Sequence, residues 1–329
     1  MKKPRFIGIS VLMAFVLVVA ACGDDDDDTT PAEAFRIAIV APSASNDLAF
    51  TQSIVDAVNV IAGEMGNVDI QVTDGTFVVD DAAAAIRGYA DDGVDLVIAH
   101  GSQYGGSLAE IAPDFPDTAF VWGTSADTFG LSNVSSYEAA SDEGGYVMGV
   151  MGAALSQSGV IGIVGPIEVG DAKLYVDGYQ AGALAEDPGA TVNINYTGSF
   201  SDVALAAEAA QAHLAAGADV LTGTAQMVVG AVGVANENTM LWFGTQANQT
   251  SLAPEIVVAS QVYHWEVVLR DLVAMIQGGT LGGEIYTIDL ANGGLVIEFN
   301  DGFDLPADVK AKADAAIAGI ADGSISTGQ

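Results

Sequence analysis

Residues 35–52 read FRIAIVAPSASNDLAFTQ and have the order of a strand, a loop and the start of a helix. The apolar run 37–41 is short, partly β-branched and closed by Pro42, as expected for a buried strand of a parallel sheet. Asn46 or Asp47 can cap the following helix, because their side-chain oxygens accept hydrogen bonds from its first N–H groups. In open α/β sheets, ligands lie beyond the carboxyl ends of the strands. This loop is therefore the first candidate for ligand contact.

The same alternation of β-rich runs and Ala-rich helical stretches continues along the chain. It predicts parallel sheets covered by helices. The expected strands lie near 35–41, 68–73, 94–99, 119–123 and 134–137, and then near 160–164, 191–196, 219–223, 239–244 and 256–260.

The second half of the chain repeats the first. Four pairs of similar segments recur in order, three at an offset of 124 residues and the last at 121. Such regular spacing indicates two similar lobes. The pairs are 39–42 with 163–166, 68–77 with 192–200, 93–97 with 217–221, and 123–127 with 244–248.

Two doubly wound lobes joined by crossing segments enclose a cleft between the carboxyl ends of their strands, where small-molecule sites concentrate. Aromatic, amide and carboxylate side chains on the cleft loops suit a neutral ring that carries hydroxyl groups. The repeat places these loops at 42–51 with 166–175, 100–105 with 224–230, and 123–127 with 244–248. The candidate ligand residues on them are Asp47, Phe50, Gln103, Tyr104, Trp122, Ser125, Asp171, Tyr175, Gln226 and Gln246.

Two of these candidates also have a plain structural interpretation. Asp47 binds a ligand hydroxyl, caps the helix, or does both. Phe50 stacks on a ligand ring, or it belongs to the core, since Ile54 and Val58 follow it at helical spacing.

The length, apolar content and charge of the chain limit which classes of protein and ligand are possible. The chain has 329 residues, enough for two domains, and 50% of them are apolar, which allows a sizeable core. Asp and Glu number 43 against 9 Lys and Arg, and the resulting formal charge of -34 argues against nucleic acid and disfavours anionic ligands. We interpret the acidity as a solvated coat that keeps the protein soluble.

Neither a cofactor nor a metal ion is expected. The glycines of segment 162–165 fall within a strand and lack the G-x-G-x-x-G turn of a dinucleotide site. The histidines His100, His213 and His264 have spacings that fit no zinc signature. His213 lies in an Ala-rich stretch and is expected at the surface of a helix.

The first 34 residues have the pattern of an exported lipoprotein. Lys2, Lys3 and Arg5 precede an apolar core, which ends in the small-residue cleavage site VAAC at 19–22. Residues 1–21 are thus expected to be a signal peptide, with Cys22 as the lipidated N-terminus at the cell envelope. An uncleaved anchor is the rival interpretation, but the apolar run is short for a membrane span.

Residues 22–34 contain five consecutive aspartates and read as a self-repelling tether. The expected limits of the lobes are 35–133 with about 260–283 for the first, and 134–259 with about 284–329 for the second.

Several motifs resemble the basic membrane protein family of solute-binding lipoproteins, which includes purine-nucleoside receptors of ABC importers. The loop NDLAFTQ at 46–52 is similar to the family's D-x-S-F-N-Q signature. The resemblance runs from about residue 35 to the C-terminus. It implies a type I periplasmic-binding-protein fold and delivery of a solute to a permease. Further matching segments are 116–120, 143–149, 153–156, 160–165, 198–202, 217–220, 293–295 and 309–325.

The chain differs from this family at three positions where family members bind a nucleoside. Thr51 replaces the family's asparagine, Gln246 replaces an acid that pairs with ribose hydroxyls, and Tyr263 stands in place of a lysine. Thr51 and Tyr263 join the candidate ligand residues, although Tyr263 can instead pack between the lobes. A free purine base is therefore as plausible a ligand as a nucleoside.

The sequence is compatible with three functions. The first is a monomeric, membrane-tethered binding protein that passes a purine-like ring compound to an ABC permease. The second is a ligand sensor that signals to a receptor. The third is an envelope enzyme acting on a nucleoside, with carboxylates such as Asp47 and Asp171 as acid and base. No histidine pair or cysteine nucleophile supports this third interpretation, so we expect a protein that is not an enzyme.

Overall fold

In a computed structural model of the protein, the structure describes residues 33–328. The expected signal peptide, Cys22 and nearly all of the acidic tether lie outside these residues. Within the described part, residues from Ala34 onward belong to one contact unit. No helix of this part is long and apolar enough to cross a membrane.

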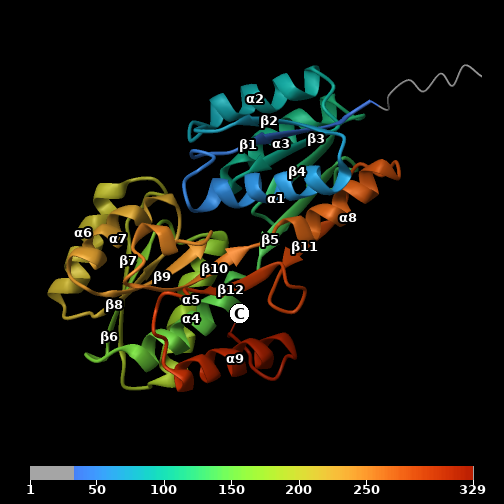
Figure 1. The fold of residues 1–329 in the computed structure, drawn as a ribbon. Helices are drawn as coiled ribbons and strands as arrows, with labels where there is room; N and C mark the ends of the chain where they lie inside the picture. The colour runs from blue at the N-terminus through green and yellow to red at the C-terminus, as the bar shows by residue number, and fades with distance from the viewer. Residues whose placement is uncertain (1–32, 329) are drawn as a thin grey trace, which may run out of the picture. The chain divides into compact units, whose positions relative to one another are not determined.

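The first sheet has six parallel strands in the order β11-β5-β4-β3-β1-β2 (Figure 1). Apolar side chains that alternate along β1 fill cores on both of its faces, which is why the run is continuously apolar. Helices α1 (Phe50–Met65) and α8 (Glu266–Gln277) cover one face, and α2 (Val79–Asp91) and α3 (Gly105–Ile111) cover the other. The strands are β1 (Phe35–Val40), β2 (Val68–Thr73), β3 (Leu96–His100), β4 (Ala119–Gly123), β5 (Val134–Ala139) and β11 (Ile285–Ile288).

The second sheet has the order β12-β10-β9-β8-β6-β7, and only β12 runs antiparallel to its neighbour. Helices α4 (Ser141–Leu155), α5 (Gly170–Glu186) and α9 (Ala307–Ala321) cover one face, and α6 (Val203–Ala215) and α7 (Val229–Glu237) cover the other. The strands are β6 (Val160–Gly165), β7 (Thr191–Tyr196), β8 (Val220–Gly223), β9 (Leu241–Gln246), β10 (Val257–Tyr263) and β12 (Leu295–Phe299).

The two sheets confirm the α/β class and the duplication. In each, the second strand of the lobe is at the edge, followed by the first, third, fourth and fifth. Each of the ten expected strands is present, with ends shifted by at most three residues. Short 3-10 helices follow strand β3, helix α3, strand β8 and strand β9. They span Ser102–Tyr104, Ala112–Asp114, Gln226–Val228 and Thr250–Leu252.

The expected limits of the lobes need correction. Strand β5, expected to open the second lobe at residue 134, pairs with β4 of the first sheet. Strand β10 pairs with β9 as far as Val262, so the second lobe continues past the expected limit at about 260. Strand β11, expected in the second lobe, adds to the first sheet beside β5. Each lobe thus completes its fifth strand before the chain crosses, because that strand finds its hydrogen-bonding partner within its own sheet.

Close helix packing fixes the start of α5, which matters for the site. Helices α4 and α5 approach so closely that a Cβ atom at Gly149 would lie 2.1 Å from the carbonyl oxygen of Tyr179. The glycines of the segment 143–149 therefore let the two backbones meet. Helix α5 is thus held against the rest of the second lobe through Tyr175, Val176 and Tyr179.

His213 is not at the surface, contrary to expectation. Its side chain is 1% exposed, and its Nε2 atom donates to the carbonyl oxygen of Ile163 at 3.1 Å. Gly162 makes the room, since a Cβ atom there would lie 2.5 Å from the imidazole ring. Burial lowers the pKa of His213, so the ring is held neutral.

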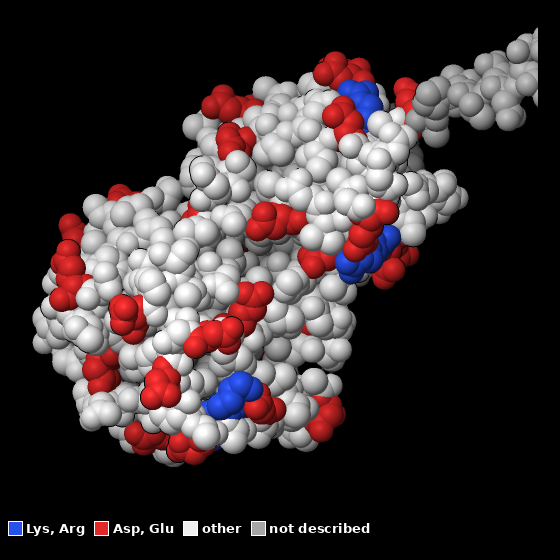
Figure 2. All heavy atoms as spheres, in the orientation of Figure 1, with Lys and Arg blue, Asp and Glu red and all other residues white. Residues whose placement is uncertain are grey.

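Acidic side chains dominate the surface. Figure 2 shows red Asp and Glu groups scattered over the visible face and only isolated blue Lys or Arg groups. The basic side chains sit beside acids: Arg87 binds Asp114, Arg270 binds Glu64, and Lys312 binds Glu186. The surface therefore offers no basic patch for nucleic acid among the described residues.

Candidate functional site

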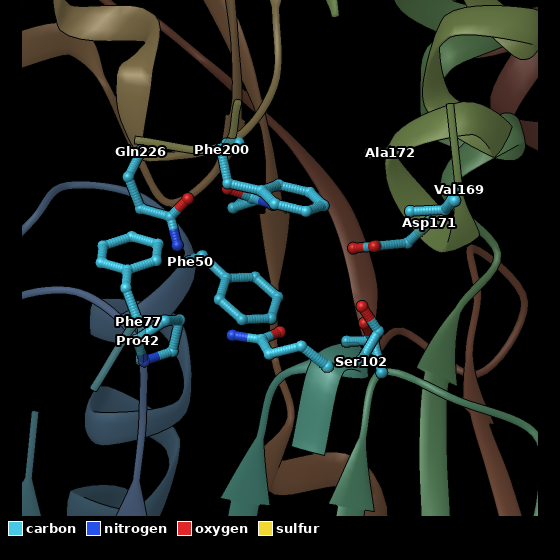
Figure 3. Close-up of a pocket in the computed structure, with 13 residues that line it drawn as sticks. Pro42, Phe50, Phe77, Ser102, Val169, Asp171, Ala172, Phe200 and Gln226 are labelled. Carbon is cyan, nitrogen blue, oxygen red and sulfur yellow. The ribbon is translucent and has the colours of Figure 1, made fainter. Parts of the chain in front are cut away.

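A pocket lies where the carboxyl ends of strands from both sheets face each other (Figure 3). It encloses about 440 Å³ of space free of protein atoms, counting the part open to solvent. The first lobe lines it with Pro42, Phe50, Phe77, Ser102, Gln103 and Thr124, and the second with Val169, Asp171, Ala172, Phe200, Ala225, Gln226 and Gln246.

Three phenyl rings form the apolar walls. Phe50 begins α1, Phe77 follows β2, and Phe200 follows β7. Phe50 is 8% exposed, whereas Phe77 keeps 38% of its surface exposed and lies at the mouth. In Figure 3 the three rings surround one end of the opening, together with Pro42 and Gln226. Rings in such positions bind a flat aromatic compound by offset stacking and edge contacts.

Three buried polar atoms in the pocket have no hydrogen-bonding partner in the protein. They are Asp171 Oδ2, Gln226 Oε1 and Gln246 Oε1. Buried polar groups in folded proteins are normally paired, because an unpaired one loses its hydration without compensation. Three such atoms on one cavity make it the candidate ligand site.

Of the lining residues in the described part of the chain, Asp171 alone carries a carboxylate. Burial raises its pKa to about 6, and the backbone N–H groups of Ala172 and Asp171 and the hydroxyls of Thr124 and Tyr263 partly oppose this rise. Among the described residues that line the pocket, none is Lys, Arg or His. The carboxylate is thus ionised at neutral pH without a cation beside it.

The backbone is strained at two lining residues. Ala225 has a φ angle of 75° and Gln246 one of 72°, both in the left-handed region that residues with a Cβ atom rarely adopt. Ala225 follows β8 and Gln246 ends β9, so the two residues lie at the carboxyl ends of neighbouring strands of the second sheet. Such conformations cost about 1–3 kcal/mol each and persist where the surroundings impose them, often at ligand sites.

His100 positions Phe50 from behind. The two rings stack with their centroids 4.0 Å apart, and His100 Nε2 lies 3.1 Å from the carbonyl oxygen of Phe50. Since that oxygen can only accept, Nε2 carries the proton, and burial lowers the pKa of His100 to about 3, which keeps the ring neutral. Its Nδ1 then accepts from the hydroxyl of Tyr137 at 2.6 Å.

Five of the twelve candidate ligand residues line the pocket, namely Phe50, Gln103, Asp171, Gln226 and Gln246. The other seven do not line it, although the Tyr263 hydroxyl reaches the Asp171 carboxylate from behind the pocket wall. Asp47 confirms its capping interpretation, since its carboxylate accepts from the backbone N–H groups of Ala49, Thr51 and Gln52 and from the Ser43 hydroxyl. Thr51 is buried against the Ser43 hydroxyl at 2.6 Å.

The aromatic candidates outside the pocket use their polar atoms within their own lobes. The Tyr104 hydroxyl donates to the carbonyl oxygen of Thr76 at 2.8 Å. Trp122 Nε1 donates to the carbonyl oxygen of Gly101 at 3.1 Å, and its ring stacks on Phe129. Ser125 is bound through its backbone N–H to the carbonyl oxygen of Tyr137, and the Tyr175 hydroxyl lies 2.6 Å from Thr222 Oγ1.

Tyr263 lies where the chain crosses from the second lobe to the first. Its hydroxyl is 2.6 Å from Ser141 Oγ and accepts from Gln261 Nε2 at 3.2 Å. Ser141 begins α4, directly after another crossing. The residue thus joins two crossing segments, and its side chain is 4% exposed.

Sequence reasoning missed the pair Phe77 and Phe200. Both end the repeated segments 68–77 and 192–200, so the repeat contained the signal that loops after the second strand of each lobe face the cleft. Six further lining residues were missed as well, although all of them fall on loops expected at the cleft, namely Pro42, Ser102, Thr124, Val169, Ala172 and Ala225. Among the described residues, no group of three or more His, Cys, Asp or Glu is placed to hold a metal ion.

Comparisons with known proteins agree with this architecture. A purine-binding protein of Brucella abortus is 26% identical over 245 residues, which are 74% of this chain and 69% of that protein. The transcriptional activator protein Med of Bacillus subtilis is 25% identical over 260 residues, 78% of this chain and 80% of that protein. A solved ABC transporter system solute-binding protein from Conexibacter woesei has a TM-score of 0.74 at 25% identity, covering 89% of this chain and 98% of that one.

The fold that the sequence resemblance implied is confirmed by these neighbours, which share the type I arrangement of two doubly wound lobes. A family profile described as ABC transporter substrate-binding protein PnrA-like matches residues 34–317. The chain belongs to the PnrA-like family of ABC transporter substrate-binding proteins.

Proposed function

We propose that the protein captures a small, flat, polar ring compound in the interlobe pocket and delivers it to the permease of an ABC importer. The observation that carries this proposal is the pairing of three phenyl walls with three buried, unpartnered polar atoms. The walls suit the faces of a ring, and the polar atoms suit the groups at its edge.

A purine base or nucleoside is the first ligand to test. One relative is titled a purine-binding protein, which supports a purine here. The position at which the family carries a ribose-binding acid is Gln246 in this chain, and its Oε1 is buried and unpartnered in the pocket. An amide still bonds to a hydroxyl, but more weakly than a carboxylate does. We therefore propose that a free base binds as well as its nucleoside.

The leader and tether complete the proposal. Export by residues 1–21 and lipidation of Cys22 would hold the protein at the outer face of the membrane, where it acts as a monomer beside its permease. Mass spectrometry of the mature protein tests this step, and an N-terminus at Cys22 with attached acyl chains is the expected result. An unprocessed N-terminus would contradict it.

Calorimetric titration of the purified protein tests the ligand class. We expect saturable binding of at least one purine base or nucleoside, with a rise in thermal stability on binding. Phe200→Ala should weaken that binding, because it removes one wall of the pocket. Phe303→Ala is the matched control, since Phe303 packs in the core of the second lobe and does not line the pocket. If no purine base or nucleoside binds, the purine assignment is wrong, but the family membership is unaffected.

A sensor is the second candidate, because one relative is titled a transcriptional activator. In that case the ligand-bound form would engage a receptor in place of a permease. Affinity purification of the tethered protein from membranes, with and without ligand, separates the two: permease subunits favour import, and a signalling receptor favours the sensor.

A further inference from the structure

We infer that the ring compound taken by this pocket is a cationic nitrogen heterocycle, whose positive charge is matched by the buried carboxylate of Asp171 and whose faces lie against Phe50 and Phe200. The inference rests on the proposed function and narrows its ligand class. It concerns charge, which neither the family nor the titles of the relatives assign.

The first argument is the missing counter-charge. A buried carboxylate is normally paired, because its removal from water is compensated only by a cation or by several hydrogen bonds. Asp171 Oδ2 has no hydrogen-bonding partner, and none of the described lining residues is Lys, Arg or His. Lys173, two residues further along α5, is bound to Asp177 and Glu168 and is partly exposed. Two backbone N–H groups and the hydroxyls of Thr124 and Tyr263 compensate part of this charge, but Oδ2 is left without a partner and no cation of the described lining residues faces the carboxylate.

The second argument is that the positive end of α5 is already in use. A helix N-terminus ordinarily favours an anion, because its first N–H groups are unpaired. Here the carboxyl group of Asp171 accepts hydrogen bonds from the backbone N–H groups of Asp171 and Ala172. An anionic ligand would meet a negative charge at this place, and two of the first N–H groups of the helix are already bound to it. The chain thus selects against anions as well as for cations.

The third argument is the aromatic wall. Figure 3 shows the carboxyl group of Asp171 pointing toward the side of the opening where Phe50 and Phe200 lie. The face of a phenyl ring attracts a cation, and this attraction grows when the pair is shielded from water. A charged heterocycle between these rings therefore gains from its faces and from its edge together. A neutral ring meets the carboxylate through uncharged donors alone, which bind it more weakly than a charged N–H group does.

The glutamines do not decide the charge of the ligand. A side-chain amide offers an oxygen or an N–H₂ group after rotation, so Gln226 and Gln246 adapt to donors or acceptors on the ring. The carboxylate has no such freedom while it is ionised. Burial raises the pKa of Asp171 only to about 6, so it is ionised at pH 7.5 in the free protein. Asp171 is therefore the specificity-determining residue.

Four probes on one bicyclic ring separate charge from shape. They are 2-aminobenzimidazole, which protonates readily; benzimidazolone, which has N–H donors but no charge; benzimidazole, which is neutral; and benzimidazole-2-carboxylate, which is an anion. We expect calorimetric titration at pH 7 to show the amino compound binding at least about tenfold tighter than either neutral ring. The carboxylate should bind weakest. Equal or tighter binding of the neutral or anionic rings would overturn the inference.

Two variants with the same change in net charge complete the test. Asp171→Asn removes the buried carboxylate without changing its shape and should abolish the preference for the cation, while the neutral rings keep their affinity. Glu168→Gln removes an exposed carboxylate from the same loop, outside the pocket, and should leave all four affinities unchanged. A preference that survives Asp171→Asn contradicts the assignment. The thermal unfolding of each free variant shows that it is folded.

The outcomes also separate this inference from the proposed function. If uncharged purines bind and the cationic probe does not, the inference fails and the function stands. If neither the purines nor any benzimidazole binds, both fail.

Discussion

The imidazole ring of His100 stacks at a centroid distance of 4.0 Å on the phenyl ring of Phe50, which lines the candidate ligand pocket. His100 itself does not line the pocket. It holds Phe50 through the stacked ring and through the bond from Nε2 to the carbonyl oxygen of Phe50. The first turn of α1 is thus positioned by a residue at the end of β3, so a ligand wall in one loop depends on the neighbouring loop.

This relationship predicts that His100→Ala weakens ligand binding without removing any ligand contact. Loss of the stacked ring leaves a cavity behind Phe50 and frees its backbone, so we expect about a tenfold loss of affinity. Stability should fall by roughly 2–4 kcal/mol, as for other truncations of buried side chains. Calorimetric titration and urea unfolding measure the two effects.

His213→Ala is the matched control. His213 is also a buried histidine whose Nε2 donates to a carbonyl oxygen at 3.1 Å, but it lies outside the pocket. It should lower stability by a similar amount and leave the affinity unchanged. If both variants lose affinity equally, the effect follows from stability alone and His100 has no positioning role.

The pH dependence of stability should report on Asp171. Its pKa is about 6 in the folded protein, raised by burial from an unfolded value near 3.8. The folded state therefore holds the proton more tightly, and the stability that this gives is fully present below pH 3.8 and is lost as the pH rises through 6. At pH 7.5 the ionised carboxylate costs roughly 1–3 kcal/mol, so Asp171→Asn should stabilise the free protein there by that amount.

Urea unfolding of parent and variant at pH 5 and pH 7.5 measures this difference. His100 acts in the opposite direction, because its pKa is lowered to about 3 and its stabilising contribution is lost as the pH falls below 6.5. For this reason the informative quantity is the difference between variant and parent at each pH. A stabilisation that is equal at both pH values would contradict the assigned ionisation of Asp171.

The sequence predicted strands such as β1, β3 and β6 well because they are largely buried, and a continuous apolar run between turn residues is hard to mistake. The edge strands β2 and β7 are half-exposed and alternate apolar with polar residues instead. The limits of the two lobes were harder to predict from the sequence. Strands β5 and β10 are similar in composition to their neighbours, and only pairing across the sheet shows that each stays with the four strands before it. Strands β11 and β12 are short and half-exposed, and neither carries a counterpart in the repeat.

Side-chain roles were predictable only where a residue had no local partner. Asp47 and Asp171 occupy equivalent loops in the sequence. The carboxylate of Asp47 accepts hydrogen bonds from N–H groups at the start of α1, whereas Asp171 Oδ2 has no hydrogen-bonding partner. Tyr104 and Tyr175 likewise have the composition of ligand residues but bond to Thr76 and Thr222 inside their lobes. These partners come from distant segments of the chain, so spacing along the sequence does not reveal them.

The acidic surface predicts a strong dependence of stability on salt. The chain has 43 acidic and 9 basic residues, and the described basic side chains are scattered among acids. Repulsion within such a coat opposes the compact state and is screened when the Debye length falls. We expect the Tm to rise by several degrees, about 5 °C or more, between roughly 0.05 and 1 M sodium chloride.

Potassium chloride is the control for a specific ion effect. It should give the same rise, because screening depends on ionic strength and the described residues form no metal site. A Tm that stays constant, or that falls with salt, would show that the acids are far enough apart in the folded protein to be harmless.

Gln249 makes a hydrogen bond from one lobe to the other. Its Nε2 atom donates to the carbonyl oxygen of Leu48 in the loop before α1, at 3.3 Å, and to that of Thr245 in its own lobe. Trp242 Nε1 donates to Gln249 Oε1 at 2.9 Å and fixes the orientation of the amide. Since hinged lobes open to release a ligand, this bond has to break in the opening step.

We therefore predict that Gln249→Ala accelerates ligand release by roughly 2–10-fold, the equivalent of one hydrogen bond, and changes the association rate little. Stopped-flow measurements of both rates test this. Ser260→Ala is the control, because the Ser260 hydroxyl accepts from the backbone N–H of Gln249 and makes no contact across the lobes. It should lower stability and leave the release rate unchanged. Equal acceleration in both variants would show that loosening of the loop after β9, and not the bond between the lobes, controls release.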